Sequence, residues 1–192
     1  MKLPRVRTPE WLLGRFEALY KDPPHYEASY YGPINGLLTV HFPVADGFLV
    51  TPQARLRQPP KGEGRTSIDS VGQVVGTFDD DGSPDFVVSY GSAELHQDVP
   101  LLIYEVKNED TSFESTAAQM DRYIAWGKEY QGQAQGAERE IWGVLVIGSK
   151  SNIFYLDPKS LKQVKYSEFG LNTMGTHIME LLQTVRESTE LL

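Results

Sequence analysis

The apolar residues near the start of the chain are spaced as on one face of a helix. They are Trp11, Leu12, Phe16 and Leu19, within "TPEWLLGRFEALY". This spacing predicts an amphipathic helix. Thr8 is the expected N-cap, Pro9 lies in the first turn, and Glu10 lies near the positive end of the helix dipole. The two prolines of the following "KDPPH" end the helix.

Two apolar runs after this helix predict a hairpin. "LLTVHFPV" and "GFLVTPQARL" are expected to be strands joined by a turn at "ADG". Pro43 and Pro52 interrupt these runs. Because proline cannot donate to a sheet ladder, we expect edge strands or irregular extended chain here.

The pattern becomes more regular from Val71 onward. "VGQVVGTF", "PDFVVSY" and "PLLIYEVK" predict three strands, and "STAAQMDRYIAWGKEY" predicts a helix. "IWGVLVIGS" and "NIFYLDP" predict two more strands, and "THIMELLQTVRESTELL" predicts an amphipathic C-terminal helix. This order of elements is typical of an α/β fold, here a mixed central sheet flanked by helices.

We interpret residues 1–192 as a single domain. Its expected parts are an N-terminal helix (1–24), an extended or hairpin arm (25–70), a core (71–157) and a C-terminal helix (158–192). The apolar face of the C-terminal helix suits either a homodimer interface or the chain's own sheet, and packing on the sheet is the favoured interpretation.

The composition is that of an ordinary soluble globular protein, with 40% hydrophobic and 23% charged residues among 192. No run approaches the roughly 18 apolar residues of a membrane span, and the N-terminus lacks the pattern of a signal peptide. We therefore expect an intracellular protein of the cytoplasm or nucleus, with no membrane partner. The absence of cysteine excludes disulfides and thiolate zinc sites.

The net charge of −8 argues against a broad phosphate-binding surface, because such surfaces need clustered Lys and Arg. It does not exclude nucleic-acid chemistry, since a carboxylate-rich site takes a metal ion that offsets its charge. One stretch, "QARLRQPPKGEGR", is basic. Its cations, Arg55, Arg57, Lys61 and Arg65, belong either to a solvated loop or to an arm that contacts a substrate.

Three charged residues lie at the ends of two apolar strands. Asp85 begins one predicted strand, and Glu105 and Lys107 end the next. The strand period places Glu105 and Lys107 on one face, the face expected for Leu101 and Ile103. If the strands are neighbours, Asp85 and Glu105 meet at one end of the sheet with Lys107 beside them.

Two carboxylates in a sheltered notch suit a hard divalent cation such as Mg²⁺. A lysine beside them can position or deprotonate a water, or stabilise charge developing on phosphorus. The alternative is structural, because a Glu-x-Lys pair is common on solvated strands and Pro-Asp is common at turns.

The spacing Pro84-Asp85…Glu105-Val106-Lys107 resembles the signature of the PD-(D/E)XK superfamily of restriction-endonuclease-like nucleases. The resemblance implies a restriction-endonuclease-like core in which 71–157 is catalytic. It implies that Asp85 and Glu105 bind Mg²⁺, or Mn²⁺ as a substitute, with help from the Val106 carbonyl. Lys107 then acts on the nucleophile.

The next predicted helix contains Gln119-Met120-Asp121-Arg122-Tyr123, a Q-x-x-x-Y motif similar to that of the RecB-like and lambda-exonuclease-like branch. There the Gln and Tyr flank the active site and contact substrate or order the lysine. The two residues share a helix face. A polar rim residue and a core aromatic remain the alternative.

Some members of the superfamily complete the metal site with an acid from the first helix. Glu10, Glu17 and Glu27 are the candidates. Glu17 is preferred, because the position of Glu10 at the start of the helix is already explained by the helix dipole. The stretches "YYGPINGLLTVHFP" and "GFLVTPQARLR" also resemble uncharacterised superfamily members from mushroom-forming fungi.

The leading hypothesis is a metal-dependent nuclease that hydrolyses phosphodiester bonds of DNA, or less favourably RNA, with endonuclease and exonuclease both open. The alternative is a catalytically inactive module on the nuclease fold that binds or assembles partners. The third reading is an accidental match, which requires the two strands not to be neighbours. The four histidines show no metal spacing, and Asp79 to Asp81 read as a solvated turn.

Overall fold

The computed structural model describes residues 5–54, 56, 83–94, 97–131, 139–156, 163–170 and 177–191. Its elements in chain order are α1 (Glu10–Lys21), α2 (Ala28–His41), the 3-10 turn η1 (Val44–Asp46), β1 (Phe48–Pro52), β2 (Phe86–Tyr90), β3 (Val99–Lys107), α3 (Phe113–Gln131), β4 (Trp142–Ile147), β5 (Lys150–Leu156), β6 (Gln163–Gly170), α4 (His177–Glu187) and the 3-10 turn η3 (Ser188–Leu191).

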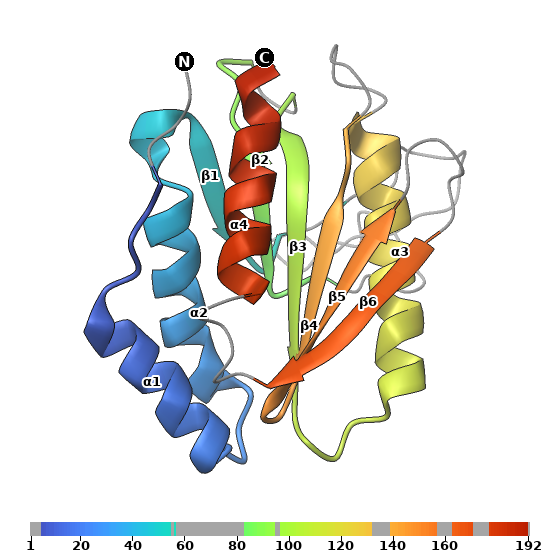
Figure 1. Cartoon of the computed structure of the whole chain (residues 1–192). Helices are drawn as coiled ribbons and strands as arrows, with labels where there is room; N and C mark the ends of the chain where they lie inside the picture. The colour runs from blue at the N-terminus through green and yellow to red at the C-terminus, as the bar shows by residue number, and fades with distance from the viewer. Residues whose placement is uncertain are drawn as a thin grey trace, which may run out of the picture.

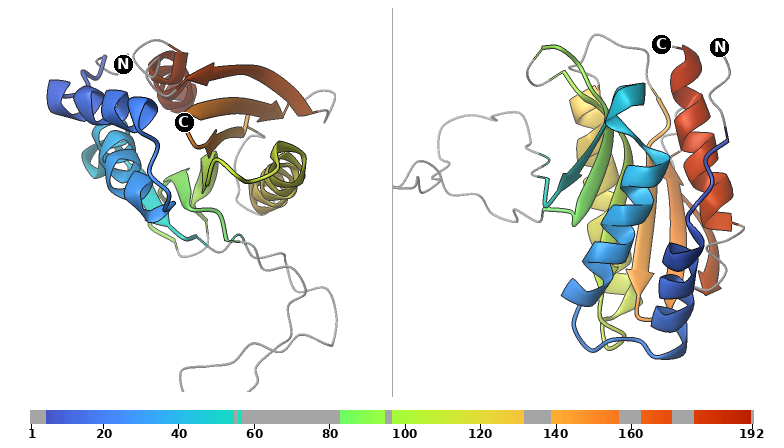
Figure 2. Two further views of the ribbon diagram at one scale, coloured as in Figure 1. Left: turned by 90° about the horizontal axis from the view of Figure 1, so that it is seen from below. Right: turned by 90° about the vertical axis from the view of Figure 1, so that its left-hand side faces the viewer.

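The strands form one mixed sheet in the order β1-β2-β3-β4-β5-β6. Neighbouring strands are antiparallel except β3 and β4, which are parallel and are connected through α3. Helices α1, α2 and α4 cover one face of the sheet, and α3 covers the other (Figures 1 and 2). The predicted α/β fold with a mixed sheet flanked by helices is therefore confirmed.

Two apolar cores lie on the two faces of the sheet. The larger joins the helices α1, α2 and α4 to the sheet, and its members from α2 are Tyr30, Ile34, Leu37 and Leu38. The smaller packs α3 on the other face through Met120, Tyr123 and Ile124. Burial of these side chains is the main term that holds the layers together.

The predicted strand over "LLTVHFPV" is wrong, because its first five residues are the end of α2. The arm assigned to 25–70 is likewise wrong over 28–41. Short apolar runs do not distinguish a strand from a buried helix, and Pro33 inside α2 hides the helical pattern. The second strand of the expected hairpin is present as β1.

Helix α1 is present where predicted, but two of its details differ. Trp11 is 69% exposed and does not belong to the apolar face. Thr8 does not cap the helix; its hydroxyl is instead hydrogen bonded to His41 Nε2 at 2.8 Å. The Thr8 side chain is therefore buried against the end of α2 and does not cap α1.

At the C-terminal end, strand β6 lies in the part assigned wholly to a helix (158–192), so that assignment is wrong over Gln163–Gly170. Helix α4 buries an apolar face in the larger core, as predicted for packing on the chain's own sheet. The buried residues of this face are Ile178, Leu181, Leu182 and Val185. Among the described residues, no helix combines the length and the apolar character needed to cross a membrane.

The side chains of β3 do not alternate strictly between the two faces of the sheet, and the exception is at Leu101. Ile103 packs against α3, whereas Leu101 packs in the core on the other face. The register between β2 and β3 shifts here, since Val88 pairs with Leu102 and Ser89 with Pro100. Because the shift skips Leu101, the expectation that Leu101 shares a face with Ile103 is wrong.

Candidate active site

Asp85 and Glu105 lie opposite each other where β2 begins and β3 ends. Phe86 pairs with Tyr104 in the antiparallel register, so Asp85 and Glu105 form the next pair outward. Figure 1 shows β3 ending at the lower edge of the sheet, where the chain turns toward α3. The expectation that these two strands are neighbours is confirmed, whereas an accidental match of the motif required them to lie apart.

At this end of the two strands, the side-chain carboxylates accept hydrogen bonds from main-chain N–H groups of the neighbouring strand. The Val106 N–H donates to Asp85 Oδ2 at 2.7 Å, and the Asp85 N–H donates to Glu105 Oε2 at 3.2 Å. Both side chains are buried, with 8% of Asp85 and 1% of Glu105 exposed. Like charges opposite each other on neighbouring strands repel, so this arrangement costs stability unless cations or donors offset it.

Lys107 supplies a cation to this pair. Its Nζ lies 2.6 Å from Glu105 Oε1, and its side chain is 22% exposed. The two residues are separated by one position on β3, which places them on the same face. We call Asp85, Glu105 and Lys107 together the carboxylate site.

The electrostatics of the carboxylate site keep Lys107 charged. Burial raises the pKa of Glu105 to about 7; the hydrogen bond from Lys107 opposes this rise and the charge of Asp85 adds to it. Burial alone would lower the pKa of Lys107, but Glu105, Glu27 and Asp85 together raise it. In this arrangement Lys107 is an ammonium group near neutral pH, which suits stabilisation of negative charge better than proton abstraction.

Helix α2 brings two further side chains to the carboxylate site. Glu27 immediately precedes this helix and accepts a hydrogen bond from the Asn108 N–H at 3.3 Å. One turn later, the Tyr31 hydroxyl donates to Asp85 Oδ1 at 2.5 Å. Burial raises the pKa of Tyr31, and the bond to Asp85 raises it further, so its hydroxyl stays a neutral donor.

Sequence reasoning missed Tyr31 and ranked Glu27 below Glu17. The available signal was the spacing of four between Glu27 and Tyr31, which shares a helix face. That signal was lost because the segment was interpreted as extended chain.

The preferred helix acid, Glu17, is not among the contacts of the carboxylate site. Glu17 Oε1 is paired with Lys21 Nζ at 3.0 Å, and the Lys21 and Glu17 side chains are 69% and 45% exposed. Glu10 is paired with Arg7 on the surface at 3.1 Å. Of the three candidate acids, it is Glu27 that contributes to the electrostatics of Lys107.

Helix α3 carries the Q-x-x-x-Y residues and packs on the face of the sheet to which Ile103 of β3 points, opposite the face that α2 covers. Gln119 Nε2 donates to the Tyr123 hydroxyl at 2.5 Å. Burial raises the pKa of Tyr123, and the charges of Glu105 and Asp85 add to the rise. The Tyr123 hydroxyl therefore lies within electrostatic range of both carboxylates.

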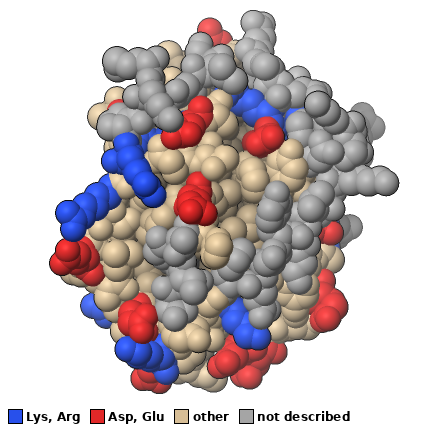
Figure 3. All heavy atoms as spheres, in the orientation of Figure 1, with Lys and Arg blue, Asp and Glu red and all other residues tan. Residues whose placement is uncertain are grey.

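The basic residues predicted to contact substrate, Arg55, Arg57, Lys61 and Arg65, lie outside the described residues, as do Asp79 to Asp81. On the face that carries α1, α2 and α4, the described Lys and Arg side chains are interspersed with Asp and Glu (Figure 3). Gathering of positive charge into one patch is not seen among the described residues in this view.

The donor set of the carboxylate site fits a hard cation. Mg²⁺ is commonly held by one or two carboxylates, completed by water and substrate phosphate oxygens. Asp85, Glu105 and the Val106 carbonyl provide oxygen donors of this kind. Within the described ranges, no group of three or more His, Cys, Asp or Glu side chains is arranged to hold a metal ion.

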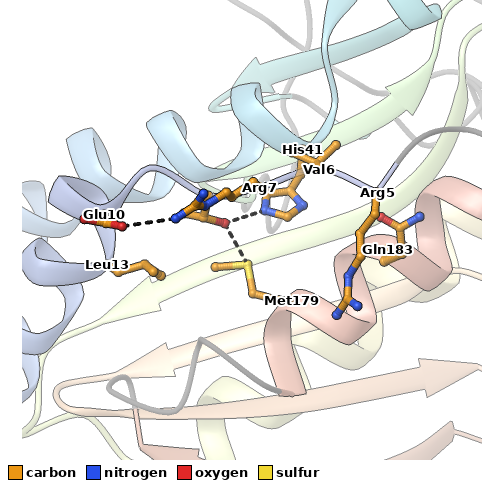
Figure 4. Close-up of a pocket in the computed structure, with 9 residues that line it drawn as sticks. Arg5, Val6, Arg7, Glu10, Leu13, His41, Met179 and Gln183 are labelled. Carbon is orange, nitrogen blue, oxygen red and sulfur yellow. Dashed lines mark hydrogen bonds and ion pairs between the residues drawn. The ribbon is translucent and has the colours of Figure 1, made fainter.

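A pocket of about 310 Å³ lies at the other end of α2. It is lined by the segment before α1, by His41 at the end of α2 and by residues of α4 (Figure 4). Thr8 is one of the lining residues, and its hydroxyl is hydrogen bonded to His41 Nε2 and donates to Met179 Sδ at 3.2 Å. We call this region the His41 pocket.

Comparison of the chain with protein-family models, with curated proteins and with solved structures finds no match.

Proposed function

We propose that the chain is a metal-dependent nuclease that hydrolyses phosphodiester bonds of DNA, with RNA the less favoured substrate. One observation carries the proposal: Asp85, just before β2, lies beside Glu105, near the end of β3. The Asp85 N–H donates to Glu105 Oε2 at 3.2 Å, and Lys107 Nζ lies 2.6 Å from Glu105 Oε1. Buried charges of this kind are costly unless they are paired or bind a cation.

The core is proposed to be restriction-endonuclease-like. Its support is the order of the elements around the motif: Asp85 precedes β2, Glu105 and Lys107 end β3, and α3 follows before the parallel strand β4. Tyr123 of the Q-x-x-x-Y pair on α3 packs in the same apolar cluster as Ile103 of β3.

In this proposal Asp85, Glu105 and the Val106 carbonyl hold Mg²⁺ or Mn²⁺. When bound, such an ion polarises the scissile phosphate and lowers the pKa of a water molecule. Lys107, kept protonated by its three carboxylate neighbours, stabilises negative charge on the phosphate oxygens. Gln119 and Tyr123 flank the substrate, and the basic stretch from Arg55 to Arg65 contacts its phosphates.

The test is cleavage of supercoiled plasmid, linear duplex DNA, single-stranded DNA and RNA in Mg²⁺, Mn²⁺ or EDTA. Asp85→Asn, Glu105→Gln and Lys107→Met are compared with wild type, and Asp110→Asn, an exposed carboxylate on the loop after β3, is the matched control. We expect metal-dependent cleavage that the three site variants lose and the control keeps. Absence of cleavage together with absence of metal binding would instead favour an inactive binding or assembly module.

A further inference from the structure

Tyr31 connects helix α2 to the carboxylate that begins β2. Its hydroxyl donates to Asp85 Oδ1 at 2.5 Å. Its ring packs edge-on against Phe86, with the ring centroids 5.7 Å apart at 84°. The side chain is half-buried, so the ring is held by packing while the hydroxyl reaches the rim of the sheet.

Two donors hold the Asp85 carboxylate, one on each oxygen. Tyr31 donates to Oδ1, and the Val106 N–H donates to Oδ2 at 2.7 Å. The main chain of Asp85 is also fixed, because its carbonyl accepts the Gln53 N–H at 2.7 Å. The carboxylate is therefore restrained in one orientation although Glu105, a like charge, lies directly opposite.

We propose that Tyr31 is a positioning residue for Asp85. Its hydroxyl fixes the carboxylate in the orientation that accepts the Val106 N–H and that presents Asp85 beside Glu105 as a cation ligand. The part of this inference that concerns metal and cleavage rests on the proposed function, whereas the orientation of Asp85 does not. Partners that orient a metal ligand in this way typically influence affinity or activity 10–100-fold.

A purely structural role would make Tyr31 a link between α2 and the sheet. Tyr31→Phe separates the two roles, because it keeps the ring against Phe86 and removes only the hydroxyl. The neighbouring residue offers a matched control. Tyr30 is fully buried on the same helix, and its hydroxyl has no hydrogen-bond partner among the described residues, so Tyr30→Phe removes a hydroxyl without breaking a described hydrogen bond.

The experiment compares wild type, Tyr31→Phe and Tyr30→Phe in four measurements: Mn²⁺ affinity by calorimetry, kcat and KM for DNA cleavage, the melting temperature, and hydrogen exchange of the Val106 amide. In Tyr31→Phe we expect roughly 10–100-fold weaker Mn²⁺ binding, a lower kcat with little change in KM, and faster Val106 exchange. Raising the Mn²⁺ concentration should restore part of kcat. Tyr30→Phe should match wild type in all of these.

The outcomes separate this inference from the proposed function. If wild type cuts no nucleic acid, the nuclease proposal fails, and faster Val106 exchange confined to Tyr31→Phe still supports the positioning of Asp85. Unchanged Val106 exchange in folded Tyr31→Phe would overturn it. If wild type is active, the inference would also be overturned by a Tyr31→Phe variant that keeps the Mn²⁺ affinity and kcat of wild type. Losses in Tyr31→Phe no larger than those in Tyr30→Phe would overturn it as well.

Discussion

The two ends of helix α2 bury ionisable groups in opposite ways. At its start, Glu27 and Tyr31 face the carboxylate site, where Lys107 stays an ammonium group 2.6 Å from Glu105, although burial raises the pKa of Glu105 to about 7. At its end, about 20 Å away along the helix axis, burial and the charge of Arg186 lower the pKa of His41 to about 4. The first end keeps a half-buried lysine charged, and the second end keeps a buried histidine neutral.

This difference indicates which end is suited to chemistry. Retaining buried charge costs stability, and perturbed, charged groups near a sheet edge are candidates for a functional site. A buried neutral histidine that is hydrogen bonded to a threonine is better explained by packing. The carboxylate site is therefore our candidate for catalysis, and the His41 pocket is interpreted as part of the structural core.

The largest expected effect is on cleavage, from removal of the Lys107 charge. Lys107→Met should lower kcat about 10²–10³-fold, because it removes the ammonium group that we propose to stabilise the phosphate. Lys21→Met is the control, since Lys21 forms an exposed pair with Glu17 and such pairs contribute little. Steady-state cleavage assays with both variants check this, and an active Lys107→Met enzyme would contradict the assigned role.

The second largest expected effect is a loss of folding stability at acidic pH, caused by the buried His41. The unfolded chain binds a proton at His41 near pH 6.5, whereas the folded chain binds it only near pH 4. Folding stability from this residue is therefore complete above about pH 6.5 and is lost as the pH falls toward 4, by up to about 3 kcal/mol.

The charged groups described around His41 come from α4, from η1 and from the N-terminal part of the chain. Arg186 of α4 faces it and is paired with Asp46 of η1. The other charged residues that line the pocket are Arg5, Arg7 and Glu10. Denaturant unfolding at pH 7.5 and 4.5 should show the loss in wild type and in the control His25→Gln, whose histidine is exposed. An equal loss in His41→Gln would show that another group causes it.

A smaller loss of stability is expected from the partner of His41. Thr8→Val keeps the shape of the side chain and removes the hydroxyl that is hydrogen bonded to His41 Nε2. It should lower the free energy of unfolding by about 1–3 kcal/mol, because a buried nitrogen loses its partner. The exposed Thr184, altered to Val, is the control. Cleavage at saturating substrate should not change; a large loss of kcat would make the His41 pocket part of the active site.

The smallest expected effect is on kcat and distinguishes two acids, Glu27 and Glu17. Glu27→Gln removes a carboxylate that accepts the Asn108 N–H next to Lys107 and adds negative charge near its ammonium group. We expect a decrease in kcat of about tenfold or less, that is about 1.4 kcal/mol. Glu17→Gln should leave kcat unchanged, because Glu17 is paired with Lys21 on the surface. The opposite result would restore Glu17 as the acid of the site.

Sequence patterns were sufficient where one local rule determines the structure. The apolar strands β2 and β3 end in charge, and their antiparallel pairing follows from short connections, so Asp85, Glu105 and Lys107 could be brought together from the sequence. The helical spacing of Gln119 and Tyr123 was equally informative, since the hydrogen bond between them is present in α3.

The rest depends on tertiary contacts that local patterns do not encode. Helix α2 contains Pro33 and still forms, because Ile34, Leu37 and Leu38 are buried against the sheet. Tyr31 could not be assigned to the site before α2 was known to be a helix. The bond between Thr8 and His41 joins residues 33 positions apart, and no local rule predicts it in place of a helix cap.

Whether Asp85 and Glu105 bind a cation is tested most directly by Mn²⁺ binding, measured by calorimetry on wild type, on the double variant Asp85→Asn/Glu105→Gln and on Asp110→Asn. We expect one Mn²⁺ site in wild type and in Asp110→Asn, and its loss in the double variant while the protein remains folded. Equal binding by all three proteins, or no binding by wild type at saturating Mn²⁺, would contradict the assignment of Asp85 and Glu105 as cation ligands.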